Sequence, residues 1–249
     1  MATLTLAGLM VFFLVSSVVG VRLVLLWTRT RQLPELLIGI GVLGIGPCGF
    51  SLAVVSRALA ESAPDASRLF WLVAFLAMNA GGAATYTFNW RVFQRDRAWA
   101  RAAAVGATLA LLIVWTLEIG AATPFEGRPS AGFEIASWLR IVCLLWAGGE
   151  SLLYHKRMRR RLPLGLADPV VCNRFLLWGI GIGAAGVGSL IGTVATMLTD
   201  SAHPPAWINL SSSLHGLAAA IGMWLAFLPP GWYLAWLAKA KPAPQTTDA

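Results

Sequence analysis

The chain has 249 residues, of which 57% are apolar and only 12% are charged, and its mean hydropathy is +0.70. This composition excludes an ordinary water-soluble domain. The formal net charge of +8 would suit nucleic acid, but the distribution of the cations along the chain favours membrane insertion and contact with lipid headgroups. We therefore expect membrane lipid, and no nucleic acid, as a partner.

Seven apolar stretches are each long enough to cross a bilayer, which takes about 20 helical residues. In chain order they are residues 4–27, 35–56, 69–90, 101–121, 133–154, 173–198 and 206–237. We predict an all-α integral membrane protein, a seven-transmembrane-helix bundle that forms one domain over residues 1–238. Residues 239–249 contain Pro, Gln, Thr and Asp and are predicted to be a disordered cytoplasmic tail.

The basic residues fall almost entirely in alternate connections. The connections after the first, third and fifth stretches, together with the tail, contain Arg29, Arg31, Arg91, Arg95, Arg97, Arg101, Lys156, Arg157, Arg159, Arg160, Arg161, Lys239 and Lys241. The only basic residues in the other connections are Arg57, Arg68 and Arg128. Because Lys and Arg accumulate in cytoplasmic loops, we predict that the amino terminus lies outside and the carboxyl terminus lies in the cytoplasm.

Prolines interrupt two of the stretches. Pro47 removes a backbone hydrogen bond in the middle of the second helix and is expected to kink it. Pro229 and Pro230 are expected to disturb the seventh helix, so that Gly231–Lys239 forms a short helix at the headgroup boundary. The glycines of the second and sixth stretches predict close helix packing.

The fifth stretch carries the most informative polar residues. Arg140, Cys143, Ala147, Glu150 and Tyr154 follow one another at 3-4-3-4 spacing, which predicts that all five lie on one seam of the bundle. Arg140 lies roughly 10 Å from the external end of its helix, at about 1.5 Å per residue. Charged residues at such depth are rare and usually face the bundle interior or water.

Other stretches place polar groups at a similar depth. We hypothesise an outward-facing polar ligand-binding cavity lined by Asn79, Glu118, Arg140, Ser212 and His215. Three structural alternatives remain open. Glu118 and Arg140 would form a satisfied ion pair, Asn79 would join two helices, and His215 would bond a neighbouring backbone group.

A second polar set is expected at the cytoplasmic ends of the helices. It contains Arg91, Glu150, Tyr154, Asn173 and Arg174. Glu150 would pair with Arg174 or Arg91, either as a latch that opens in a signalling or transport cycle or as a static anchor. The basic run Lys156–Arg161 is a candidate site for anionic lipid or a cytoplasmic protein partner.

Several chemistries are not supported. Residues 206–237 contain no lysine for a retinal Schiff base, and the three histidines are not placed as a haem pair. His, Cys and carboxylate residues do not converge at one depth as a zinc site requires, and no acid accompanies the serines near His215. We therefore expect no metal, no cofactor and no enzymatic activity.

These observations favour a receptor-like or sensor-like seven-helix protein with a role in signal transduction, which binds a small or amphipathic ligand. The alternatives are a transporter or channel with buried Arg and Glu stations, or a structural assembly subunit. Abundant alanine, arginine and tryptophan with few lysines suggest a bacterial inner membrane.

Overall fold

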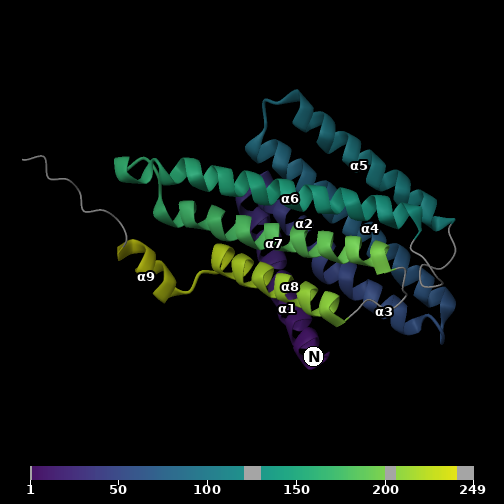
Figure 1. Cartoon of the computed structure of the whole chain (residues 1–249). Coiled ribbons are helices and arrows are strands. Elements are labelled where there is room, and N and C mark those ends of the chain that lie inside the picture. The colour runs from purple at the N-terminus through teal and green to yellow at the C-terminus, as the bar shows by residue number, and fades with distance from the viewer. Residues whose placement is uncertain (1, 121–129, 200–205, 240–249) are drawn as a thin grey trace, which may run out of the picture.

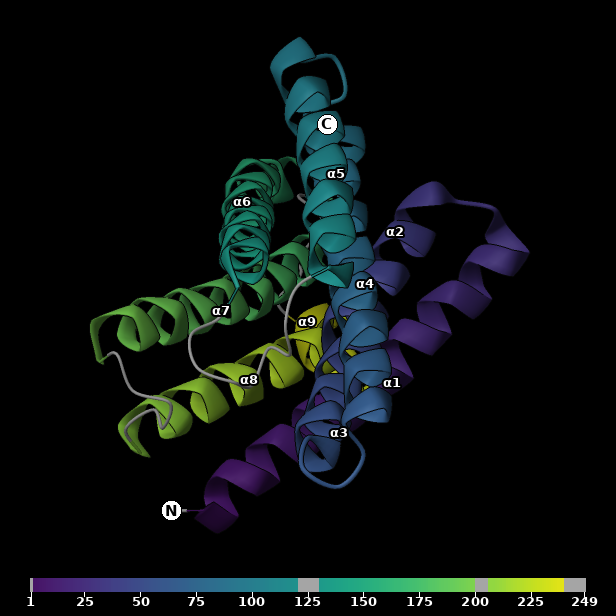
Figure 2. The same cartoon turned by 90° about the vertical axis from the view of Figure 1, so that its right-hand side faces the viewer.

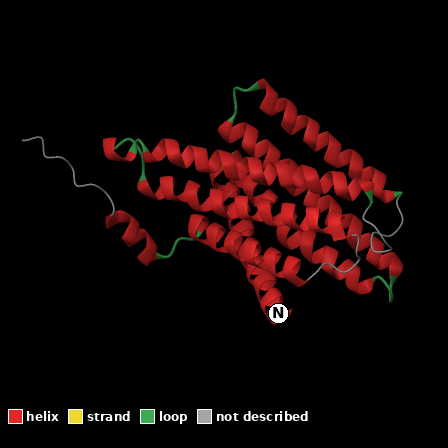
Figure 3. Ribbon diagram, in the orientation of Figure 1, coloured by secondary structure: helices red, strands yellow, loops and turns green. Residues whose placement is uncertain are grey.

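The computed structural model describes residues 2–120, 130–199 and 206–239, and these are helical with short connections (Figure 1, Figure 3). The elements are α1 (Ala2–Thr30), α2 (Leu33–Leu43), η1 (Gly44–Phe50), α3 (Ser51–Leu59), α4 (Pro64–Phe88), η2 (Asn89–Phe93), α5 (Ala98–Ile119), α6 (Ala131–Arg159), η3 (Leu162–Leu164), α7 (Pro169–Thr199), α8 (Ala206–Phe227) and α9 (Gly231–Lys239). Seven spans within the described residues are long and apolar enough to cross a membrane, which confirms the predicted helical class. They indicate an integral membrane protein whose outer helix surfaces contact lipid.

The second span is built from three consecutive elements. Helix α2 continues into the π-helix η1 and then into α3, and Pro47 lies inside η1. Proline has no N–H to donate, and its ring clashes with the carbonyl of the residue four positions earlier. The wider π-helical turn accommodates both effects. The disturbance predicted at Pro47 is therefore confirmed.

The last predicted stretch, residues 206–237, is two helices rather than one. Helix α8 ends at Phe227, two residues before Pro229, and α9 begins at Gly231. Trp232 and Trp236 of α9 are exposed, as expected for a helix at a membrane boundary. The predicted tail lies outside the described residues except for Lys239, the last residue of α9.

Six of the spans form a closed ring. Each of α1, α2, α4, α6, α7 and α8 contacts the next, in the order α6, α7, α8, α1, α2, α4 and back to α6. Figure 2 shows α6 and α7 on one side of this arrangement and α1 and α2 on the other. Helix α5 lies outside the ring and packs on α4 and α6.

Glycines set the spacing of the ring where backbones touch. A Cβ added to Gly148 of α6 would lie 2.9 Å from the Gly183 Cα of α7. A Cβ added to Gly222 of α8 would lie 2.7 Å from the Leu177 carbonyl oxygen of α7. Since no side chain fits at these distances, glycine is what lets α7 approach both neighbours, as small residues do in membrane proteins.

The bundle has two ends, the amino-terminal face and the basic face. At the amino-terminal face, α1, α4, α6 and α8 begin; at the basic face, α2, α5 and α7 begin. The connections at the basic face, with the helix ends beside them, contain Arg29, Arg31, Arg91, Arg95, Arg97, Arg101, Lys156, Arg157, Arg159, Arg160 and Arg161. Most cations of the described bundle thus lie at one end, while Arg57 and Arg68 lie at the amino-terminal face.

The glycine contact between α6 and α7 predicts a difference between neighbouring variants. Gly148→Ala should lower the midpoint of thermal unfolding, because overpacking against backbone costs about 1–3 kcal/mol. Gly149→Ala is the matched control, since its Cβ would meet nothing within 4 Å. The control should match the wild type or gain up to about 1 kcal/mol from helix propensity. Equal midpoints for the two variants in detergent would contradict this account.

Candidate functional site

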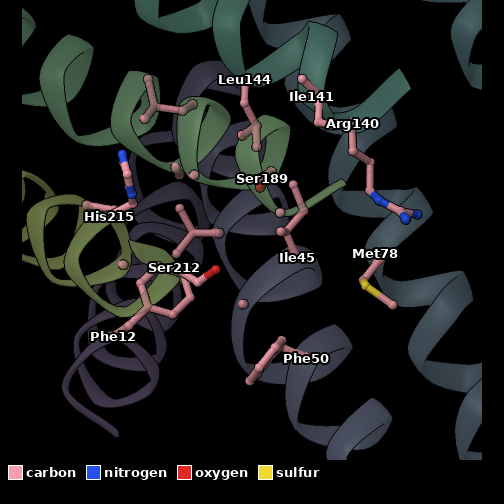
Figure 4. A pocket seen from close by; sticks show the side chains of 18 of the residues that line it. Phe12, Ile45, Phe50, Met78, Arg140, Ile141, Leu144, Ser189, Ser212 and His215 are labelled. Carbon is pink, nitrogen blue, oxygen red and sulfur yellow. The ribbon is translucent and has the colours of Figure 1, made fainter. Parts of the chain in front are cut away.

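A cavity of about 880 Å³ lies inside the six-helix ring, and every helix of the ring contributes to its wall. Figure 4 shows Arg140 and Met78 on one side of the cavity and Phe12 and His215 on the other. The volume lies in the range of about 300–1,000 Å³ that is usual for small-molecule sites.

The wall is polar at one end and apolar at the other. The polar side chains nearer the amino-terminal face are Glu134, Ser137, Arg140, Ser189, Thr193, Thr196, Ser212, Ser213 and His215. Toward the basic face, the wall is formed by Leu37, Ile38, Phe88, Trp178, Ile182 and Met223. Thr85 also lies in this half, but its hydroxyl donates to the Gly81 carbonyl oxygen at 2.9 Å. The cavity is therefore amphipathic along its length.

Arg140 of α6 contributes a buried guanidinium to this wall. Its terminal nitrogens donate to Asn79 Oδ1 at 2.6 Å and to Ser137 Oγ at 3.1 Å. Its guanidinium carbon lies 5.5 Å from the ring centre of Phe75 and 5.7 Å from that of Phe133. Neutral hydrogen bonds and ring faces thus hold a charge that is costly inside a membrane.

Asn79 lies behind Arg140 rather than on the cavity wall, which corrects its predicted position. It is 3% exposed, and its amide nitrogen donates to the Leu111 carbonyl oxygen at 3.0 Å. One side chain of α4 therefore connects α5 with α6. This is the interhelical role that was considered as the structural alternative.

Glu118 does not line the cavity and does not pair with Arg140, which corrects both expectations. Its carboxylate accepts from Trp71 Nε1 at 3.0 Å and from Ser130 Oγ at 2.6 Å. Within the described chain, no carboxylate oxygen lies within 4 Å of the Arg140 guanidinium. The reason is topological, because Glu118 belongs to α5 and that helix lies outside the ring.

Ser212 and His215 line the cavity, as predicted. His215 Nδ1 lies 2.7 Å from the Ser211 carbonyl oxygen. Since a carbonyl only accepts, this nitrogen carries the proton and donates. His215 thus forms the backbone bond that was considered for it, while its ring packs over Gly188.

The expected pairing of Glu150 at the basic face is not formed. Glu150 accepts from Gln94 Nε2 at 2.5 Å and from Trp146 Nε1 at 3.3 Å. Arg91, one of its expected partners, stacks on the Trp90 ring at 4.3 Å. Glu150 is therefore held by neutral donors.

The remaining residues of the predicted latch join α7 to other helices. Arg174 Nε donates to the Ala226 carbonyl oxygen of α8 at 3.0 Å, so it is directed away from Glu150. Asn173 Nδ2 donates to the Tyr233 hydroxyl of α9 at 2.8 Å. The Tyr154 ring of α6 lies 4.6 Å from the Phe175 ring of α7. The residues of the predicted latch therefore do not form one cluster. Glu150 bonds to Gln94 and Trp146, whereas Asn173 and Arg174 bond to α9 and α8.

Several wall residues were not singled out from the sequence. Ser137 lies one helical turn before Arg140, and Ser189 continues the face of α7 that carries Thr193 and Thr196. That 4-3 spacing is a helical-face signal that could have identified Ser189. Glu134 and Trp178 carry no comparable signal, since a charge near a helix start and an aromatic near a helix end are common in membrane proteins.

The basic run Lys156–Arg161 is exposed except for half-buried Met158. His155, which precedes it, contacts the Cys172 carbonyl oxygen through Nδ1 at 2.9 Å. Among the residues with a described placement, no three His, Cys, Asp or Glu side chains gather as a metal site would require.

No protein-family description, no curated protein and no solved structure matches this chain.

The contacts of Asn79 predict a loss of stability when it is replaced. Asn79→Leu removes the acceptor of Arg140 and leaves a buried charged donor with one fewer partner, which costs about 1–3 kcal/mol. The midpoint of thermal unfolding in detergent should fall accordingly. Thr116→Val is the control, because the Thr116 hydroxyl is exposed and bonds only within its own helix. A loss for Thr116→Val as large as that for Asn79→Leu would contradict the role assigned to Asn79.

Proposed function

We propose that this protein is a receptor-like or sensor-like, non-enzymatic membrane protein that binds a small or amphipathic ligand in the cavity of the six-helix ring. Binding is transmitted by helix movement to a cytoplasmic partner on the basic face, where Lys156–Arg161 is the proposed docking site. The single observation that carries this proposal is the amphipathic cavity of about 880 Å³ enclosed by six helices.

In this proposal the amino-terminal face lies outside and the basic face lies in the cytoplasm of a bacterial inner membrane. The segregation of Lys and Arg to the connections of one face supports this orientation. The polar half of the cavity would then be nearer the outside. A ligand would enter from the outside, and its binding would change the conformation of the basic face.

Two alternatives from the sequence are less well supported. A transporter was expected to use Arg140, Glu118 and Glu150 as successive stations, but of these three only Arg140 lines the cavity. An assembly subunit would use exposed glycines against other helices, whereas Gly148, Gly181 and Gly222 are buried inside the bundle. The cavity therefore favours ligand binding over conduction and over assembly.

A ligand screen tests the proposed function. The wild type should be stabilised against thermal unfolding by at least one chemical class in a broad small-molecule and amphiphile panel. Ser189→Trp should abolish that stabilisation, because Ser189 is exposed within the cavity and a large side chain there occupies the ligand volume. Val187→Trp should retain it, since Val187 is exposed but does not line the cavity. A panel with no stabilising compound would count against the proposal.

Cysteine labelling tests the proposed orientation. In a Cys48→Ser background, Glu61→Cys should react with a membrane-impermeant maleimide on intact bacterial cells, because Glu61 is exposed at the amino-terminal face. Leu166→Cys, exposed at the basic face, should react only after permeabilisation. The reverse pattern would invert the orientation.

A further inference from the structure

Among the described residues that line the cavity, Arg140 is the only arginine and none is a lysine. His215 is the other basic side chain of the wall, and Arg140 is 8% exposed. Its hydrogen-bond partners, Asn79 and Ser137, are neutral. A guanidinium has five N–H donors, and the hydrogen bonds to Asn79 and Ser137 use two of them. An anion would thus supply a counter-charge that the surrounding protein does not provide.

The acidic residue of the wall, Glu134, stands in a different environment. It is half-buried and precedes Arg140 by six residues on α6, about 9 Å nearer the amino-terminal face at 1.5 Å per residue. Water at the cavity mouth screens its charge more effectively than that of Arg140, which lies deeper and is almost fully buried. The electrostatic preference of the interior is therefore set by Arg140.

Below Arg140 the wall is mainly apolar, and the one polar side-chain atom there without a partner among the described residues is the indole nitrogen of Trp178. Trp178, Ile182 and Met223 line this half, and the Thr85 hydroxyl already has a backbone acceptor. A headgroup at Arg140 would direct an attached hydrocarbon chain toward these residues. Neighbouring helices of the ring contact one another, and the polar half of the cavity lies nearer the amino-terminal face.

We infer that the cavity binds a single-chain amphiphile whose headgroup is anionic next to the chain, with the anion on Arg140 and the chain extending toward Trp178. This inference rests on the proposed ligand-binding function and specifies its ligand class. Arginine recognises carboxylate and phosphate by parallel charge-assisted hydrogen bonds, so either group satisfies the site.

The test uses three probes with the same chain and different heads. The affinity of the protein in phosphatidylcholine nanodiscs is measured for dodecyl phosphate, dodecanol and dodecyltrimethylammonium, with empty nanodiscs as the blank. Dodecyl phosphate should bind saturably, and dodecanol about tenfold to a hundredfold more weakly, as loss of a charge-assisted hydrogen bond predicts. The cationic probe should bind most weakly. Equal affinity for phosphate and alcohol, or preference for the cation, would overturn the inference.

Variants locate the headgroup. Arg140→Gln should reduce the affinity for dodecyl phosphate to that for dodecanol, and Arg140→Lys should restore part of the difference. Glu134→Gln changes a charge within the same cavity and should not weaken dodecyl phosphate binding. Arg57→Gln removes an exposed charge outside the cavity and should change nothing. If the Arg140 variants fail to fold, the order of affinities of the three probes for the wild type still decides whether the inferred ligand class is right.

Three further outcomes separate the possible explanations. Phosphatidylglycerol in the nanodisc should leave dodecyl phosphate binding unchanged; competition by this two-chain lipid would assign the site to bilayer lipid and overturn the single-chain assignment. If dodecanol binds as tightly as dodecyl phosphate and Ser189→Trp blocks both, the ligand class is wrong but the proposed binding function stands. If neither these probes nor the broad panel binds, both fail.

Discussion

Contact between helix backbones is the constraint on which the rest of this structure depends. At Gly148 and Gly222, a single added carbon would touch the backbone of α7. On the opposite side of the ring, a Cβ at Gly44 would lie 2.5 Å from the Ala77 carbonyl oxygen. With little hydrophobic driving force between helices in lipid, such contacts are what hold membrane helices together. Where α4 meets α6, Gly82 instead faces the stem of Arg140, whose Cγ would lie 3.2 Å from an added Cβ. The ring is therefore closed by backbone contacts, and at this interface it accommodates a long charged side chain.

This arrangement gives Arg140 two environments. One side of its guanidinium is bonded to Asn79, which is itself held by the backbone of α5. The second hydrogen bond of the guanidinium is to Ser137, and both Arg140 and Ser137 are among the residues that line the cavity. Removal of a charge from water is costly in hydrocarbon, and the neutral partners offset only part of that cost. An acid in place of Asn79 would satisfy the charge internally, whereas the amide leaves it available. The choice of partner thus connects the stability of the bundle to the chemistry proposed for its cavity.

Position along each helix was predictable from the sequence, whereas direction around each helix was only partly so. The spacing of Arg140, Cys143 and Ala147 correctly placed them on one buried seam. Beyond Ala147 the buried positions of α6 are Gly148 and Ser151, and Glu150 and Tyr154 are more exposed. A straight helix with 3.6 residues per turn drifts away from a 3.5-residue repeat, which explains the departure. The predicted cavity positions of Asn79 and Glu118 were wrong for another reason. Only the packing of α5 outside the ring decides which way these two side chains face.

The contacts of α7 provide a physical route from the proposed ligand to the proposed partner. This helix lines the cavity from Thr196 to Trp178 and then continues to the basic face. There it holds α9 through Asn173 and α8 through Arg174. In the proposed receptor, a ligand in the cavity would bind more tightly to one position of α7 than to another, and only such a difference can shift a conformational equilibrium. Because Asn173 joins α7 to α9 through one hydrogen bond, a small displacement of α7 would change how α9 is held. In the proposed receptor, a signal would thus reach the basic face without an ion passing through the bundle.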